Sequence, residues 1–68
     1  MEFTPTGVID GVNLYFTLPI VPQGMMLFRN GLFLNDGGGD YTLSGNTIIF
    51  TNGWQPQTGD ILKAWVVA

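Results

Sequence analysis

Five carboxylates are the main groups with which this chain could perform acid–base chemistry. They are Glu2, Asp10, Asp36, Asp40 and Asp60. Two carboxylates flanking a bound sugar can hydrolyse a glycosidic bond, but most of these five stand beside glycine, where aspartate is favoured because it bonds its own backbone in turns. The sequence has no histidine and no cysteine, so the usual nucleophile-and-base constellations of acyl transfer are missing. We therefore expect a protein that is not an enzyme and has no catalytic residues.

The segment from Asn35 to Asp40 is the one candidate for a metal site, because Asn35, Asp36 and Asp40 bring side-chain oxygens into a short glycine-rich stretch. Calcium requires about six to eight oxygens, and no distal glutamate completes the set as in an EF-hand loop. The glycine triplet also lacks the GK[ST] sequence of a phosphate-binding loop. We expect a plain connection between strands, with no metal and no cofactor; weak calcium binding is the alternative.

The segment Trp54-Gln55-Pro56-Gln57 is the one candidate for a ligand-binding loop. An aromatic face can stack on the C–H face of a sugar, and glutamine side chains offer both donors and acceptors to its hydroxyls. Trp54, Gln55 and Gln57 would carry such a site. The alternative is structural: the Trp54 ring folds back and covers the end of the hydrophobic core.

Size and composition predict one domain that needs support from other chains. A chain of 68 residues fits a single β-domain spanning residues 1–68, and a fold of this size buries only roughly 60% of its unfolded surface. Hydrophobic residues make up 46% of the chain and charged residues only 10%. Without cysteine or histidine, neither a disulfide nor a structural zinc site can reinforce the fold. We therefore expect assembly with further copies or a larger particle.

Charge and hydropathy exclude two classes of partner. The net charge is −3, and the only basic side chains are Arg29 and Lys63, whereas nucleic acids attract basic patches. No apolar run approaches the roughly 18 residues of a membrane-spanning helix. The acidic start of the chain is not followed by the apolar stretch of a signal peptide. We expect no nucleic-acid binding and no membrane insertion.

Glycine, proline and asparagine divide the chain into short β-type runs, typical of an all-β domain. We expect about six to seven short strands in a small antiparallel β-sandwich or barrel-like domain. Asn30-Gly31 is a strong hairpin signal, because a type I′ turn needs positive φ at both central positions, and Ser44-Gly45-Asn46 predicts a second tight hairpin. The expected strands are residues 3–9 (with a possible interruption at Thr4-Pro5), 13–18, 25–29, 32–34, 40–43, 47–51 and 60–67.

The runs 25–28 and 32–34 are apolar on both faces. One face would fill the core and the other would meet another chain, because a domain this small has at most two layers. The alternative is a central strand that simply exposes one Met or Phe. Within residues 25–28 either Met25 and Leu27 or Met26 and Phe28 could face that chain, and we expect Phe33 and Trp65 in the same subunit interface.

Several motifs, in order, resemble a small β-domain that recurs in virion proteins of tailed bacteriophages. Residues 4–13 and 16–18 look like its opening, and residues 27–31 match its LYxNG hairpin. Residues 40–50 match the sequence DYTVSGNTITF, and residues 59–62 match the GDxI sequence that begins the last strand. The resemblance covers nearly the whole chain. Its strand parity implies that Met25 and Leu27 point inward, so we expect Met26 and Phe28 in the subunit interface.

This resemblance implies a structural or adhesive module of tail fibres, baseplates or surface decoration, without family-wide catalytic residues. Two loops depart from it: residues 52–58 are bulkier than usual, and three glycines precede residue 40. We therefore expect a non-enzymatic virion component, located in the virion, that forms a homo-oligomer, with a trimer as first expectation, and contacts other virion proteins. The alternative is a monomeric carbohydrate-binding or host-receptor-binding module that recognises a host-surface glycan through the Trp54 loop.

Overall fold

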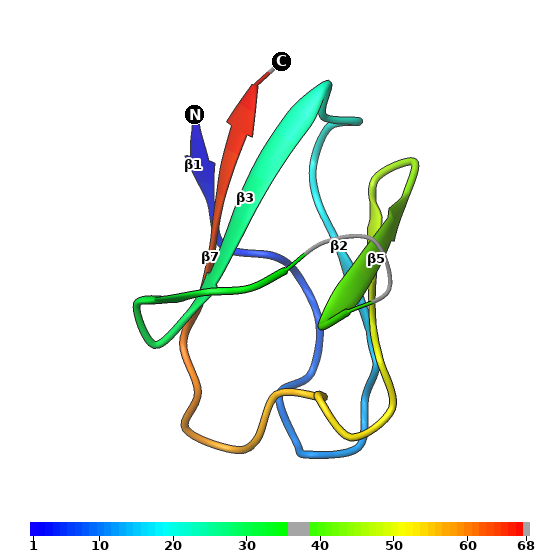
Figure 1. Ribbon diagram of the computed structural model, residues 1–68, viewed down its shortest axis with the longest axis vertical. Coiled ribbons are helices and arrows are strands. Elements are labelled where there is room, and N and C mark those ends of the chain that lie inside the picture. Colours follow the sequence, from blue (N-terminus) through cyan, green and yellow to red (C-terminus); the bar gives the residue numbers. More distant parts are fainter. Residues whose placement is uncertain (36–38, 68) are drawn as a thin grey trace.

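The chain folds into seven antiparallel β-strands, as seen in a computed structural model that describes residues 1–35 and 39–67 (Figure 1). Within these residues there is no helix, and so none that could span a membrane. The expected all-β class is confirmed. The strands are β1 (Glu2–Phe3), β2 (Tyr15–Thr17), β3 (Gly24–Arg29), β4 (Leu32–Phe33), β5 (Tyr41–Ser44), β6 (Thr47–Phe50) and β7 (Leu62–Val67).

The strands form two sheets that pack face to face as a small β-sandwich. One sheet has the order β1-β7-β3-β4 and the other the order β2-β6-β5. In Figure 1 the first sheet lies to the left and the second to the right, and both chain ends lie at the top. The two terminal strands pair directly, with Glu2 opposite Trp65 and Phe3 opposite Ala64. The first and last strands of the chain thus lie side by side in one sheet.

Alternating side chains of both sheets fill the space between them, as the period of two predicts. In β7 every second residue is buried, and Leu27 at the centre of β3 is fully buried. On the inner face of the second sheet, the rings of Phe16 and Phe50 meet edge to face with centroids 5.5 Å apart. The buried apolar core consists of Phe16, Leu18, Leu27, Leu34, Tyr41, Ile48, Phe50, Leu62, Ala64 and Val66.

Two hairpins have the turns that their sequences predict. Asn30 and Gly31 have φ values of 54° and 83°, the pair of positive angles that defines a type I′ turn. In the second hairpin Ser44 pairs with Thr47, so the turn consists of Gly45 and Asn46 alone. Gly45 has a φ of 60° and Asn46 does not have a positive φ, the pattern of a type II′ turn.

The first strand is much shorter than expected. The pairing of β1 ends at Phe3, and the expected interruption at Thr4-Pro5 is present because proline has no N–H to donate. Beyond it, Thr6 forms an isolated bridge with Thr17 of the other sheet, with N–O distances of 2.8 and 2.9 Å. Residues 4–9 therefore cross from one sheet to the other and do not extend the first strand. Of the expected connection 35–39, residues 36–38 lie outside the described residues.

Candidate functional site

Four apolar side chains from three strands share the outer face of the sheet β1-β7-β3-β4. Met26 of β3 lies opposite Trp65 of β7, and Phe28 lies between Lys63 and Phe33. Directly opposed residues of an antiparallel pair point to the same side of the sheet, and so do residues two apart in one strand. The structure thus brings together all four residues for which the sequence predicted an interface role. We call Met26, Phe28, Phe33 and Trp65 the outer apolar face.

The opposite side of the same strands faces the core. Leu27 and its partner Ala64 are fully buried, and Met25 packs against the core cluster. This confirms the predicted parity, with Met25 and Leu27 inward and Met26 and Phe28 outward. The two-sided apolar pattern of β3 therefore arises because its inner face builds the core while its outer face stays uncovered in the single chain.

The outer apolar face is open to solvent over large side chains. Met26, Phe33 and Trp65 are 49%, 54% and 47% exposed. Phe28 is half-buried, and its ring contacts the Phe33 ring with centroids 5.7 Å apart. Contiguous exposed apolar patches on soluble proteins often mark interaction sites. The free energy of the system falls when a partner covers such a face and removes it from water.

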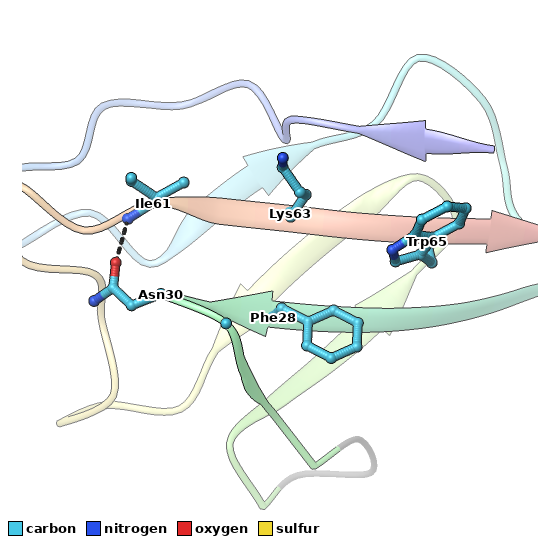
Figure 2. A pocket seen from close by; sticks show the side chains of 6 residues that line it. Phe28, Asn30, Ile61, Lys63 and Trp65 are labelled. Atoms are coloured by element: carbon cyan, nitrogen blue, oxygen red, sulfur yellow. Dashed lines mark hydrogen bonds between the residues drawn. The ribbon is translucent and has the colours of Figure 1, made fainter.

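A shallow hollow of about 500 Å³ lies at one end of the outer apolar face, where β3 and β7 run side by side (Figure 2). Its polar end is already hydrogen-bonded: Asn30 Oδ1 accepts the Ile61 N–H at 2.8 Å, and Asn30 Nδ2 donates to Asp60 Oδ1 at 3.0 Å. The hollow offers no nucleophile–base pair and no pair of facing carboxylates. Its lining consists of Phe28, Asn30, Gly31, Ile61, Lys63 and Trp65.

Lys63 is the one charged residue of this lining, and it is already paired. Its Nζ lies 2.8 Å from Oε2 of Glu2 on the neighbouring strand β1. Both side chains are well exposed, so the pair contributes little to stability. These two charges lie at the β1 side of the otherwise apolar face.

A second hollow of about 240 Å³ also has Trp65 in its lining. Its lining includes Met25 and Val66, which face the core, so this hollow is not confined to the outer apolar face. The second hollow is lined by Met1, Gly24, Met25, Met26, Trp65, Val66 and Val67.

Trp54 lies in a loop that is fastened to the end of β3. Nη1 of Arg29 donates to the Trp54 carbonyl oxygen at 2.7 Å, and the guanidinium carbon lies 5.6 Å from the centre of the indole ring. This is within the range of a cation–π contact. The indole is 40% exposed. Part of the aromatic surface considered for sugar stacking is therefore in contact with Arg29.

The two glutamines of this loop make hydrogen bonds inside the loop. Gln55 Oε1 accepts the Gly53 N–H at 2.7 Å, and Gln57 Nε2 donates to the Gln55 carbonyl oxygen at 3.2 Å. Pro56 between them is buried. The structure thus uses one polar atom of each glutamine side chain to hold the loop. Gln57 Oε1 lies close against Gly11, which leaves Gln55 Nε2 for any external ligand.

The carboxylates of Asp10 and Asp60 stabilise turns. Asp10 Oδ1 accepts the N–H groups of Asn13 and Val12, each at 2.9 Å, and these bonds lower the pKa of the Asp10 carboxyl. The pKa of Asp60 is lowered by the Gln57 N–H, then by the Asn30 amide and the nearby Arg29 charge. A general acid at neutral pH needs a raised pKa, so both groups fit a structural role.

The candidate metal segment is only partly described. Asp40 Oδ2 accepts the Asn35 N–H at 2.8 Å, and the Asp40 N–H donates to the Asn35 carbonyl oxygen at 3.0 Å. These bonds join Asn35 and Asp40, the two ends of the segment. Asp36 lies outside the described residues. Among residues 1–35 and 39–67, no three acidic, histidine or cysteine side chains cluster as metal ligands would.

Ile61, directly before β7, and Val67 at its end lie on the side of Trp65 and are strongly exposed, as the alternation of residues 61–67 indicates. Sequence reasoning missed one feature of these surfaces. The contact between Arg29 and Trp54 joins residues 25 positions apart, and no local pattern indicates it.

Comparison with protein-family models, curated protein sequences and solved structures finds no match to this chain.

Proposed function

We propose that this chain is a non-enzymatic structural component of a bacteriophage virion and acts by homo-oligomeric assembly through its outer apolar face. The observation that carries the assembly proposal is the convergence of Met26, Phe28, Phe33 and Trp65 on one uncovered sheet face. The virion assignment is supported by the resemblance of the hairpin and strand motifs to a phage β-domain. The partners proposed are further copies of this chain and other virion proteins.

The arrangement of the outer apolar face favours association over catalysis. Its large side chains are apolar, and the one charged pair beside it joins Glu2 and Lys63 within the same chain. Aromatic and Met side chains are enriched at the centre of protein interfaces, whereas charged groups are depleted there. A second copy would remove this surface from water, which provides the driving force for assembly.

Light scattering on the isolated chain, with a charge introduced into the face, tests the assembly proposal. The parent should have a multiple of the 7.4 kDa chain mass, three times that mass for the trimer we propose first. Phe28→Asp and Met26→Asp should lower the mass, because an unpaired charge in a desolvated contact costs several kcal/mol. Val21→Asp, at an exposed position in the connection from β2 to β3, should keep the parent mass.

A parent chain that is monomeric at all concentrations would contradict assembly through this face. Equal masses for the parent, Met26→Asp and Val21→Asp would show that assembly uses another surface. The virion assignment has its own test: mass spectrometry of purified particles of a phage that encodes the chain should detect it. Its absence from such particles would overturn the assignment.

A monomeric module that binds host-surface glycans is the second candidate, favoured by the exposed part of the Trp54 indole. Retention on a glycan array should then be lost in Trp54→Ala and kept in Trp65→Ala, because Trp65 lies on the outer apolar face and not in the loop. Equal retention by the two variants and the parent would remove this candidate.

A further inference from the structure

The sequence contains two Asn-Gly pairs, Asn30-Gly31 and Asn52-Gly53, and their surroundings differ sharply. Glycine after asparagine leaves the following backbone nitrogen sterically accessible, because it has no β-carbon. We propose that Asn52 is a deamidation site of the folded protein, that Asn30 is protected, and that the Gln55 side chain sets the rate at Asn52.

The reaction needs only water. The backbone nitrogen of Gly53 attacks Cγ of Asn52, and a new N–Cγ bond closes a five-membered succinimide ring. The Cγ–Nδ2 bond breaks, and the amide group leaves as ammonia, with the proton lost by the Gly53 nitrogen balancing the step. Water then opens the ring at either carbonyl carbon and produces aspartate or isoaspartate.

Asn52 has the freedom that this attack requires. It is exposed, and no hydrogen bond among the described residues involves its side chain. Asn52 and Gly53 occupy the two central positions of a turn closed by the Trp54 N–H and the Thr51 carbonyl oxygen at 2.8 Å. This single closing bond is the main backbone restraint on the pair, so local opening is easier here than within a strand ladder.

Asn30 is held at both ends of its amide. Its Oδ1 accepts the Ile61 N–H at 2.8 Å, and its Nδ2 donates to Asp60 Oδ1 at 3.0 Å (Figure 2). Its own N–H also donates to the Ile61 carbonyl oxygen at 2.8 Å. Attack by the Gly31 nitrogen requires the Asn30 amide to turn and its nitrogen to leave, so all of these bonds to the residues just before β7 oppose the reaction.

Gln55 restrains the attacking nitrogen at the exposed site. Its Oε1 accepts the Gly53 N–H at 2.7 Å, the nitrogen that must approach Cγ of Asn52. That hydrogen bond has to break before the ring can close. The side chain of Gln55 therefore acts as a positioning residue that slows the modification of Asn52.

The modification would change the loop that carries Trp54. Either product adds one negative charge to a chain whose net charge is −3. Isoaspartate also lengthens the backbone between Thr51 and Trp54 by one carbon, which disturbs the turn that joins them. The contact between Arg29 and Trp54 would then loosen. The fraction of chains with an altered Trp54 loop would therefore increase as the protein ages.

Peptide mapping of aged protein tests the proposal. The parent, Gln55→Ala and Gln55→Glu are incubated in mildly alkaline buffer and digested with chymotrypsin, which separates the two Asn-Gly pairs, and the fragments are analysed by mass spectrometry. Asn52 should convert while Asn30 remains intact. Loss of one hydrogen bond should make the conversion in Gln55→Ala roughly three- to tenfold faster, whereas Gln55→Glu keeps an acceptor oxygen and should retain the parent rate.

The parent incubated in concentrated urea is the matched reference, since both pairs should there convert at similar rates. Conversion of Asn30 before Asn52 in the folded protein would overturn the site assignment. Equal rates in the parent and Gln55→Ala would overturn the role of Gln55. These outcomes are measured on the purified chain and are independent of any phage particle.

Discussion

Gly7 lies so close to the ring of Phe16 that no larger residue fits at this position. A β-carbon built on Gly7 would collide with Cδ2 of Phe16 and lie 2.8 Å from its Cε2. The ring cannot retreat easily, because Phe16 is fully buried and packs edge to face against Phe50. The close approach follows from the bridge between Thr6 and Thr17, which brings the crossing segment onto β2.

Gly7→Ala should therefore destabilise the fold by about 1–3 kcal/mol, as overpacking of a filled core does. Urea denaturation measures this change. Gly24→Ala is the control, because a β-carbon there would lie at an ordinary 3.9 Å from Val67. If Gly7→Ala and Gly24→Ala unfold at the same urea concentration as the parent, the position of the crossing segment over Phe16 is wrong.

Gly31→Val should cost at least about 1 kcal/mol of unfolding free energy, because a β-branched residue is strained at positive φ. Gly31 has a φ of 83° and no atom within 4 Å of a built β-carbon, so the loss is conformational and not steric. Thermal melting compares it with Gly31→Asn, which should lose less because asparagine tolerates this region better. Equal melting of the valine and asparagine variants would argue against the type I′ turn.

Asp60 should make the fold sensitive to acid. Because its pKa is lower in the folded chain than the ordinary 3.8, its contribution to stability is complete above that value. The contribution is lost as the pH falls through the lower, folded-state pKa. Denaturation at a series of pH values should show a weaker acid loss for Asp60→Asn, which starts from a lower stability at neutral pH. Parallel curves for the variant and the parent would contradict this role.

Removal of divalent cations should leave the thermal midpoint unchanged. The described residues contain no cluster of three metal-ligand side chains, and the Asp40 carboxylate already accepts the Asn35 N–H. Melting with EDTA and with millimolar calcium measures the effect. A midpoint that rises by several degrees in calcium would make Asp36 and Asp40 candidate ligands, and Asp40→Asn should then abolish the rise.

Local features of this fold were predictable because their causes are local. The positive φ values at Asn30 and Gly31 follow from the dipeptide itself. The burial of Leu62, Ala64 and Val66 follows from the period of two along β7. Residues 25–28 are apolar on both faces, so the outward direction of Met26 and Phe28 rested on the family resemblance and not on alternation. The all-β class was readable from the sequence by itself.

Only the tertiary structure decided which segments meet across long distances in the chain. The run 3–9 has the composition of one strand, yet β1 ends at Phe3 and Thr6 joins the other sheet. Pro5 stops the first ladder because it has no N–H to donate, but the sheet that the chain joins next is not written in the run itself. The same holds for the Trp54 loop, whose contacts with Arg29 depend on how β3 and β7 are placed. Such contacts are set by the packing of the complete core and by the closure of long loops, and no window of sequence contains that information.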